Sequence, residues 1–431
     1  MINKSINTIT FLISGILLIT IGMLLIIKNI FTLNTLIIIS GFLFCIKGLI
    51  NLYNYAVKKE KRNIPNIIIS IMHIIFGLIC INNNNFILMT ISRIFSIYFI
   101  FIAITHLINY FIYVKYNIKG SFTNIIKFII LLILSIALLF KPIINSKYLS
   151  IILSIYLILY GINCITNFLS EVIPKNSKNK IKRSITIQLP ILLTAFIPKI
   201  LIDHINELLE TEDELKSFNV SKKNKKSDLE VLIHLAPNGS ASMGHVEVSF
   251  KDKVYSYGNY DMHSRSLFDT IGDGVILIAN KEKYIKYCIQ KRDRYIIEFG
   301  ISLTEYEKEI VEERIQTLIN VNTKEYFSDK QLAEKGIIPN KTFHDMSSEI
   351  YTEAEGKYKK IISGKYKKFF VLKNNCVMVV QHILSSVGKE ILAINGIISP
   401  GAYYNYLNKR FLMKNTNIIS RKIYIKENKS N

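Results

Sequence analysis

Hydrophobic residues dominate the first 170 positions of the chain, where long apolar runs alternate with brief polar links. Six such runs cover residues 8 to 27, 35 to 56, 66 to 81, 86 to 113, 124 to 140 and 148 to 170. A helix needs about 20 apolar residues to cross about 30 Å of hydrocarbon, and most of the runs approach that length. A buried soluble helix would explain one run but not six in succession. The pattern therefore predicts an all-α transmembrane domain of six helices over residues 1 to 173.

The six runs pair into three helical hairpins, and the second helix of each hairpin ends in a similar phrase. The phrases lie at residues 48 to 53, 106 to 111 and 162 to 168. Their spacing of about 55 residues indicates a triplicated two-helix unit, with chance similarity in an Ile- and Asn-rich chain as the alternative. This architecture resembles the HdeD-type (DUF308) bacterial membrane family. The resemblance implies a membrane protein associated with acid resistance.

The net charge of +22 is concentrated in the apolar half. Residues 1 to 184 hold 18 Lys and Arg against two Glu, a net of +16, while the remaining 247 residues hold 36 basic and 30 acidic residues, a net of +6. A nucleic-acid-binding face needs its basic charge on a folded soluble surface. The distribution therefore argues against a nucleic-acid partner.

The positions of the basic residues in the short loops predict the orientation of the membrane domain. A cytoplasmic N-terminus places twelve loop Lys and Arg on the inner side and leaves only Lys28, Lys141 and Lys147 outside. With six spans, the C-terminal domain is then cytoplasmic as well. We expect a multi-pass protein of the bacterial inner membrane whose partner is the lipid bilayer, with a homo-oligomer through the transmembrane domain left open.

Residues 174 to 227 are predicted to be a basic loop, an interfacial segment and a linker. The apolar segment from 185 to 202 contains Pro190, Pro198 and Lys199. Each proline removes a helix hydrogen bond, so an interfacial or re-entrant segment is favoured over a regular span. A seventh crossing is the alternative, and it would place the C-terminal domain outside.

From residue 228 the pattern changes to short alternating strands and amphipathic helices. Strands are predicted at 230 to 236, 244 to 250 and 254 to 257, with a tight turn between the last two. Helices are predicted at 302 to 320 and 376 to 386, and Ser302 with Glu305 forms a capping-box pattern for the first. Residues 228 to 431 therefore read as an α+β domain with an antiparallel sheet.

Two residues of this domain are candidates for nucleophilic catalysis. Cys376 follows Asn375, an N-cap residue, and a thiol at a helix N-terminus is stabilised as thiolate. His245 opens the strand 244 to 250, and strand alternation turns it and Glu247 away from the core side of Val246. His245 is thus available as a general base for the cysteine.

The order of these motifs resembles the circularly permuted papain-like (permuted NlpC/P60) superfamily. The motifs are Gly244 to Val248, Val254 to Asp261, Asn374 to Cys376 and Ser399 to Tyr403. The resemblance implies that Cys376 is the nucleophile and His245 the base. Its third position falls on the strand after the histidine, where Tyr257 and Asn259 are the candidates. Neither is the usual acidic or His residue, which leaves an inactive, ligand-binding descendant as an alternative.

Other kinds of site are less well supported by the sequence. His263, His344, Asp345 and His382 do not have a zinc-binding spacing, and no phosphate or dinucleotide fingerprint is present, so we predict no metal and no cofactor. The predicted function is a membrane-tethered cysteine hydrolase or acyltransferase acting on an amide or ester bond of a peptide or acyl substrate. The alternative is a non-enzymatic membrane stress protein whose soluble domain binds a partner or ligand.

Overall fold

The computed structural model describes most of the chain. The described residues are 8–57, 64–140, 142, 146–172, 186–187, 218–222, 224–235, 244–385, 391–392, 399–413 and 416–426. They form two compact units, one made of residues 12–107 and 122–165, and the other of residues 1–11, 108–121 and 166–431. Most of the segment 185 to 202 lies outside the described residues.

The N-terminal region is helical. Its helices are α1 (Thr8–Val57), α2 (Ile64–Asn82), α3 (Asn84–Lys115), α4 (Ser121–Phe140) and α5 (Ser146–Val172). Within the described part of the chain, five helices are long and apolar enough to cross a membrane. The first two predicted runs both lie in α1, which is continuous except at Asn29, where φ is 38° and ψ is −110°. The sequence predicted a polar link between residues 27 and 35, whereas in the structure only Asn29 departs from helical geometry.

Glycines allow α1 to approach both α2 and α5 closely. A Cβ on Gly15 would lie 2.9 Å from the carbonyl oxygen of Gly161, and one on Gly41 would lie 2.8 Å from that of Gly77. Real Cβ atoms do not come so close, so the backbones can meet only where the residue is glycine. Small residues at helix contacts are typical of membrane helices, which gain little from burying apolar groups away from lipid.

The second unit is built on a nine-stranded sheet in which every neighbouring pair of strands is antiparallel. In spatial order the strands are β2 (Val220–Ser221), β13 (Ile418–Tyr424), β8 (Tyr295–Ile301), β3 (Leu229–Leu235), β4 (His245–Phe250), β5 (Lys253–Gly258), β7 (Val275–Asn280), β10 (Lys357–Ile361) and β9 (Thr323–Tyr326). Two further pairs are β6 (Ile271–Asp273) with β11 (Lys368–Phe370), and β1 (Thr186–Ile187) with β12 (Ile391–Leu392). The predicted antiparallel sheet is confirmed.

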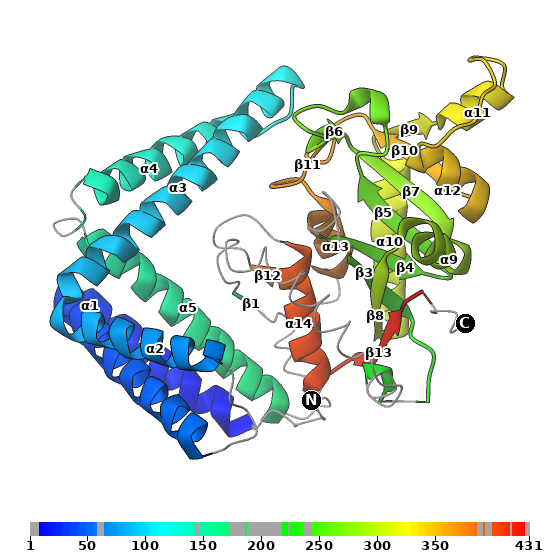
Figure 1. Ribbon diagram of the computed structural model, residues 1–431. Coiled ribbons are helices and arrows are strands. Elements are labelled where there is room, and N and C mark those ends of the chain that lie inside the picture. Colours follow the sequence, from blue (N-terminus) through cyan, green and yellow to red (C-terminus); the bar gives the residue numbers. More distant parts are fainter. Residues whose placement is uncertain are drawn as a thin grey trace. The chain divides into compact units, whose positions relative to one another are not determined.

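Helices cover both faces of the sheet (Figure 1). Val246 and Val248 of β4 belong to the core that includes α10 (Glu305–Asn320), α13 (Cys376–Leu384) and α14 (Pro400–Leu412). The core on the other face includes α9 (Lys281–Arg292) and α12 (Met346–Ala354). The short elements η3 (Met262–Ser264) and α11 (Asp329–Glu334) complete the described fold. Because strand residues alternate between faces, Glu247, which lies between Val246 and Val248, points toward the core on the other face.

The helix predicted from residue 302 begins later than its first capping pattern suggested. The capping box is made by Thr304 and Glu307, not by Ser302 and Glu305. The backbone N–H of Leu303 donates to Asp228 at 2.9 Å, and that of Ser302 donates to the carbonyl oxygen of Asn417 at 2.8 Å. These bonds keep residues 302 and 303 extended, so α10 begins at Glu305.

Gly274 lies where the backbone between β6 and β7 approaches the β10–β11 connection. A Cβ there would overlap the carbonyl oxygen of Tyr366 and lie 2.8 Å from Tyr257 Oη. We expect Gly274→Ala to cost about 3 kcal/mol of unfolding free energy, because backbone must shift to make room. Gly336→Ala is the control, since its Cβ meets nothing within 4 Å and its φ of +71° alone costs roughly 1 kcal/mol. Thermal unfolding followed by circular dichroism measures both, and equal losses would contradict the steric explanation.

Candidate functional site

Cys376 is the first residue of α13. The N-cap is Asn375, whose side-chain oxygen accepts from the backbone N–H of Met378 at 3.3 Å. The thiol side chain is buried, with 4% of the residue exposed. The local sequence therefore places the sulfur at the positive end of a helix dipole, as predicted from the Asn-Asn-Cys motif.

His245 begins β4 and contacts the cysteine. The His245 ring and the backbone N–H of Val246 lie near enough to the Cys376 sulfur to lower the pKa of the thiol. The Nε2 atom of the ring lies 2.8 Å from Ser256 Oγ and 3.3 Å from Glu247 Oε1. The His245 side chain is 21% exposed, whereas Cys376 is buried.

Glu247 connects His245 to a buried polar network on the face that α9 covers. Its carboxylate is fully buried and accepts from Tyr284 Oη of α9 at 2.7 Å. Its other oxygen is at ion-pair distance, 2.9 Å, from Nε2 of His234 on β3. His234 is directly opposite His245 in the β3–β4 register. A carboxylate held by the Tyr284 hydroxyl can orient the imidazole ring that it contacts.

The charges of this network favour an ionised pair of cysteine and histidine. Burial alone would lower the pKa of His245, but Cys376 and Glu247 outweigh it and raise that pKa to about 10. Burial would likewise raise the pKa of the Cys376 thiol, yet the His245 imidazolium and the Val246 N–H lower it below its ordinary value. The pKa of Glu247 is held well below its usual range, against the effect of burial, by His234 and His245. A thiolate next to an imidazolium is the nucleophilic form of such a pair.

Tyr257 and Asn259, the candidates for the third position, each make a hydrogen bond to a backbone carbonyl. Tyr257 Oη donates to the carbonyl oxygen of Tyr366 at 2.9 Å, in the core beneath α13. Asn259 Nδ2 donates to the carbonyl oxygen of Asp269 at 2.7 Å. The side chains that contact His245 are instead Glu247, two residues along its own strand, and Ser256 on β5.

The reactivity of Cys376 should depend on His245 and on pH. We expect Cys376 to reach half-maximal alkylation by iodoacetamide below the ordinary thiol pKa, and His245→Ala to move that midpoint upward because the imidazolium is lost. Peptide-resolved mass spectrometry across a pH series measures this. Cys288 is the internal control, since burial raises its pKa to about 12. An unchanged Cys376 midpoint in His245→Ala would contradict the pairing.

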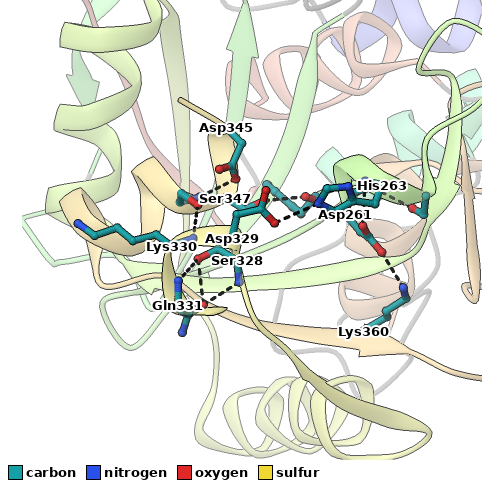
Figure 2. A network of polar contacts seen from close by, with 12 residues as sticks. Asp261, His263, Ser328, Asp329, Lys330, Gln331, Asp345, Ser347 and Lys360 are labelled. Atoms are coloured by element: carbon teal, nitrogen blue, oxygen red, sulfur yellow. Dashed lines mark hydrogen bonds and ion pairs between the residues drawn. The ribbon is translucent and has the colours of Figure 1, made fainter. Parts of the chain in front are cut away.

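A second polar cluster surrounds the segment that follows β5 (Figure 2). His263 Nε2 lies 3.1 Å from Asp329 Oδ1 of α11, and Lys360 of β10 donates to Asp261 at 2.6 Å. Lys360 also pairs with Asp273 of β6. Among the described residues, no group of three or more His, Cys, Asp or Glu is arranged to hold a metal ion. The cluster fastens η3 and β6 to neighbouring elements.

The membrane half matches a known family. Residues 13–82, 68–127 and 126–177 each match the family described as a short repeat of unknown function (DUF308). The three successive matches confirm the predicted DUF308 repeats over residues 13 to 177. No curated protein and no solved structure matches the chain. None of these comparisons supports the papain-like resemblance of residues 228 to 431, which rests on the motifs quoted above.

Proposed function

We propose that this protein is a membrane-anchored cysteine enzyme that cleaves or transfers an acyl group of an ester or amide. The observation that carries the proposal is the chain of contacts from Cys376 through His245 to the buried Glu247. In it Cys376 is the nucleophile and His245 the acid and base. Glu247 is a positioning residue, because it acts through the imidazole ring. A nucleophile, a base and an orienting group in sequence are the parts that thiol acyl transfer requires.

The chemical steps follow from this arrangement. The Cys376 thiolate attacks the substrate carbonyl carbon, and a carbon–sulfur bond forms. The carbon–oxygen or carbon–nitrogen bond then breaks, and the His245 imidazolium gives its proton to the leaving group. Water or an acceptor hydroxyl or amine attacks the thioester after losing a proton to His245, and Cys376 is released. Backbone N–H groups at the start of α13 are the donors that we propose stabilise the negative charge on the carbonyl oxygen.

We further propose that the fold of residues 228 to 431 is permuted papain-like. A histidine strand that precedes a cysteine helix supports this assignment, and in this chain β4, which begins at His245, precedes α13, which begins at Cys376. At Gly244 the chain that enters β4 passes close to the start of α14. Its φ is +80°, and a Cβ there would lie 3.0 Å from Pro400, the first residue of α14.

The proposed placement is a six-span inner-membrane protein with both termini in the cytoplasm. The Asn29 break supports six spans, because the helix on either side of it is long enough to cross the hydrocarbon. The distribution of Lys and Arg supports the orientation. All five cysteines are free, which suits a reducing compartment. In intact cells, labelling of residues 228 to 431 by a membrane-impermeant amine reagent would overturn this placement.

Trapping the acyl-enzyme tests the proposed function. Purified full-length protein in lipid nanodiscs is incubated with a p-nitrophenyl ester, quenched in acid and mapped by mass spectrometry. The expected result is a burst of nitrophenol and an acyl adduct on Cys376. The adduct should persist in Cys288→Ala and vanish in Cys376→Ala. If the wild type bound the p-nitrophenyl ester but formed no adduct, the result would favour the non-enzymatic alternative.

A further inference from the structure

The loop of residues 261 to 270, hereafter the 261–270 loop, presents apolar side chains at the surface. Phe268 is 94% exposed, and its neighbour Leu267 is 49% exposed. Met262 at the start of the loop is 46% exposed. Isolated exposed apolar residues are common, but an almost fully exposed Phe beside Leu at a loop tip is typical of a surface that inserts into an apolar phase.

The tip of this loop is held in an unfavourable backbone conformation. Leu267, Phe268 and Asp269 have φ values of 49°, 52° and 63°, all in the left-handed region and none of them glycine. Ser266 and Ile271 exchange two backbone hydrogen bonds across the base of the tip, at 2.9 and 3.2 Å. Such strain persists only where the surroundings fix it, and it is concentrated at functional sites. The fold thus keeps Phe268 exposed instead of letting it fold back.

The loop lies at the same edge of the sheet as the Cys–His pair. β4 and β5 are antiparallel, so the start of β4 at His245 and the end of β5 at Gly258 share that edge. β6 follows the loop directly and pairs with β11, which ends a few residues before Cys376. The backbone N–H of Val371 donates to the carbonyl oxygen of Thr270 at 3.1 Å. The base of the loop is therefore tied to the segment that carries the nucleophile.

The base of the loop also contacts the end of a candidate membrane span. Residues 108–121, the last turns of α3 and the turn after it, belong to the same compact unit as the sheet. Phe370 of β11 and Ile271 of β6 pack with Ile112 and Ile118 of that segment. Lys367 Nζ donates to the carbonyl oxygen of Tyr116 at 3.0 Å. α3 is one of the helices long and apolar enough to span a bilayer, so the base of the loop packs against the end of a candidate span.

We propose that the 261–270 loop inserts Phe268 and Leu267 into the bilayer surface and that the substrate of Cys376 is a lipid-borne acyl ester or amide. Insertion rests on the exposure, the strain and the contact with the end of α3. The substrate class rests in addition on the proposed function. A loop that is embedded in lipid and tied to the cysteine segment brings an acyl carbonyl to the thiolate without extracting the whole lipid into water.

Tryptophan fluorescence tests insertion, because the chain contains no Trp. Phe268→Trp in full-length protein is compared in nanodiscs made with ordinary or dibrominated phosphatidylglycerol and phosphatidylethanolamine. The control is Tyr306→Trp, at a residue that is 64% exposed. Tyr306 follows the end of β8, at the opposite end of the strands from His245. Brominated lipid should quench the first emission by more than about half and leave the second unchanged. Insertion would be contradicted if brominated lipid quenched the emission of both variants equally, or if it left the emission of Phe268→Trp unquenched.

A second measurement tests the substrate class. Phe268→Asp should reduce turnover of a lipid ester in the bilayer by about tenfold, because a charged tip no longer enters the interface. Turnover of water-soluble p-nitrophenyl acetate should be unchanged. Equal effects on the two substrates would refute the lipid substrate. If the wild type turns over neither substrate, the proposed function fails, whereas the quenching result still decides insertion.

Discussion

Replacing Cys376 with Ala should reduce ester turnover by about 10³-fold or more, because the nucleophile is lost and no other thiol can take its place. The Cys376 thiol lies beside His245, which lowers its pKa, whereas Cys288 is fully buried in the core that includes α9 and burial raises its pKa to about 12. Initial rates of p-nitrophenyl ester hydrolysis by the full-length protein in nanodiscs measure the effect.

Two variants separate the loss of chemistry from the loss of fold. Cys376→Ser preserves the size of the side chain but not the low thiol pKa, so its turnover should fall almost as far as that of Cys376→Ala while its melting temperature stays close to that of the wild type. Cys288→Ala should keep its turnover despite a small cavity cost of about 1 kcal/mol. Near-wild-type turnover in Cys376→Ala would rule out the proposed nucleophile and leave the soluble domain as a binding module.

The places of Cys376 and His245 on their helix and strand were predictable because the signals for them are local. Asn375 caps the helix that it precedes, and this places Cys376 at the N-terminus whatever the rest of the fold does. The alternation of β4 is equally local and turns His245 and Glu247 to one face. The same alternation could have indicated the contact between His245 and Glu247, since residues two apart on a strand are neighbours on one face.

The rest of the site depends on contacts between distant parts of the chain. His234 reaches Glu247 only because β3 pairs with β4, and Tyr284 reaches it only because α9 covers that face. The capping box of α10 shows the same limit on a small scale. Ser302–Glu305 and Thr304–Glu307 are both valid local patterns, and the contact of Leu303 with the distant Asp228 selects the second.

Substituting Glu247 with Gln should lower kcat/KM by about 10²-fold, because the imidazole ring keeps its place but loses the charge that stabilises its protonated form. Removing the carboxylate also leaves His234 and Tyr284 with a weaker partner, which should cost about 1 to 3 kcal/mol of unfolding free energy. The control is Glu298→Gln. Glu298 is also buried in the sheet, pairs with Lys281 at 2.8 Å and accepts from Tyr424, but it takes no part in the Cys–His network.

The pH dependence distinguishes a positioning role from a merely structural one. In the wild type, kcat/KM should rise as Cys376 ionises and fall as His245 loses its proton near pH 10. Without the Glu247 charge the pKa of His245 falls, and the pKa of the Cys376 thiol falls as well because the carboxylate had raised it, so both limbs of the bell move to lower pH. Because folding lowers the pKa of Glu247, its carboxylate stabilises the folded wild type at pH values above its unfolded pKa of about 4.3. That contribution to the free energy of unfolding is lost as the pH falls through the lower folded pKa. Glu247→Gln has no carboxylate at this position and should not show the loss. Glu298→Gln should lose stability with an unchanged bell, and an unchanged bell in Glu247→Gln would assign Glu247 to folding alone.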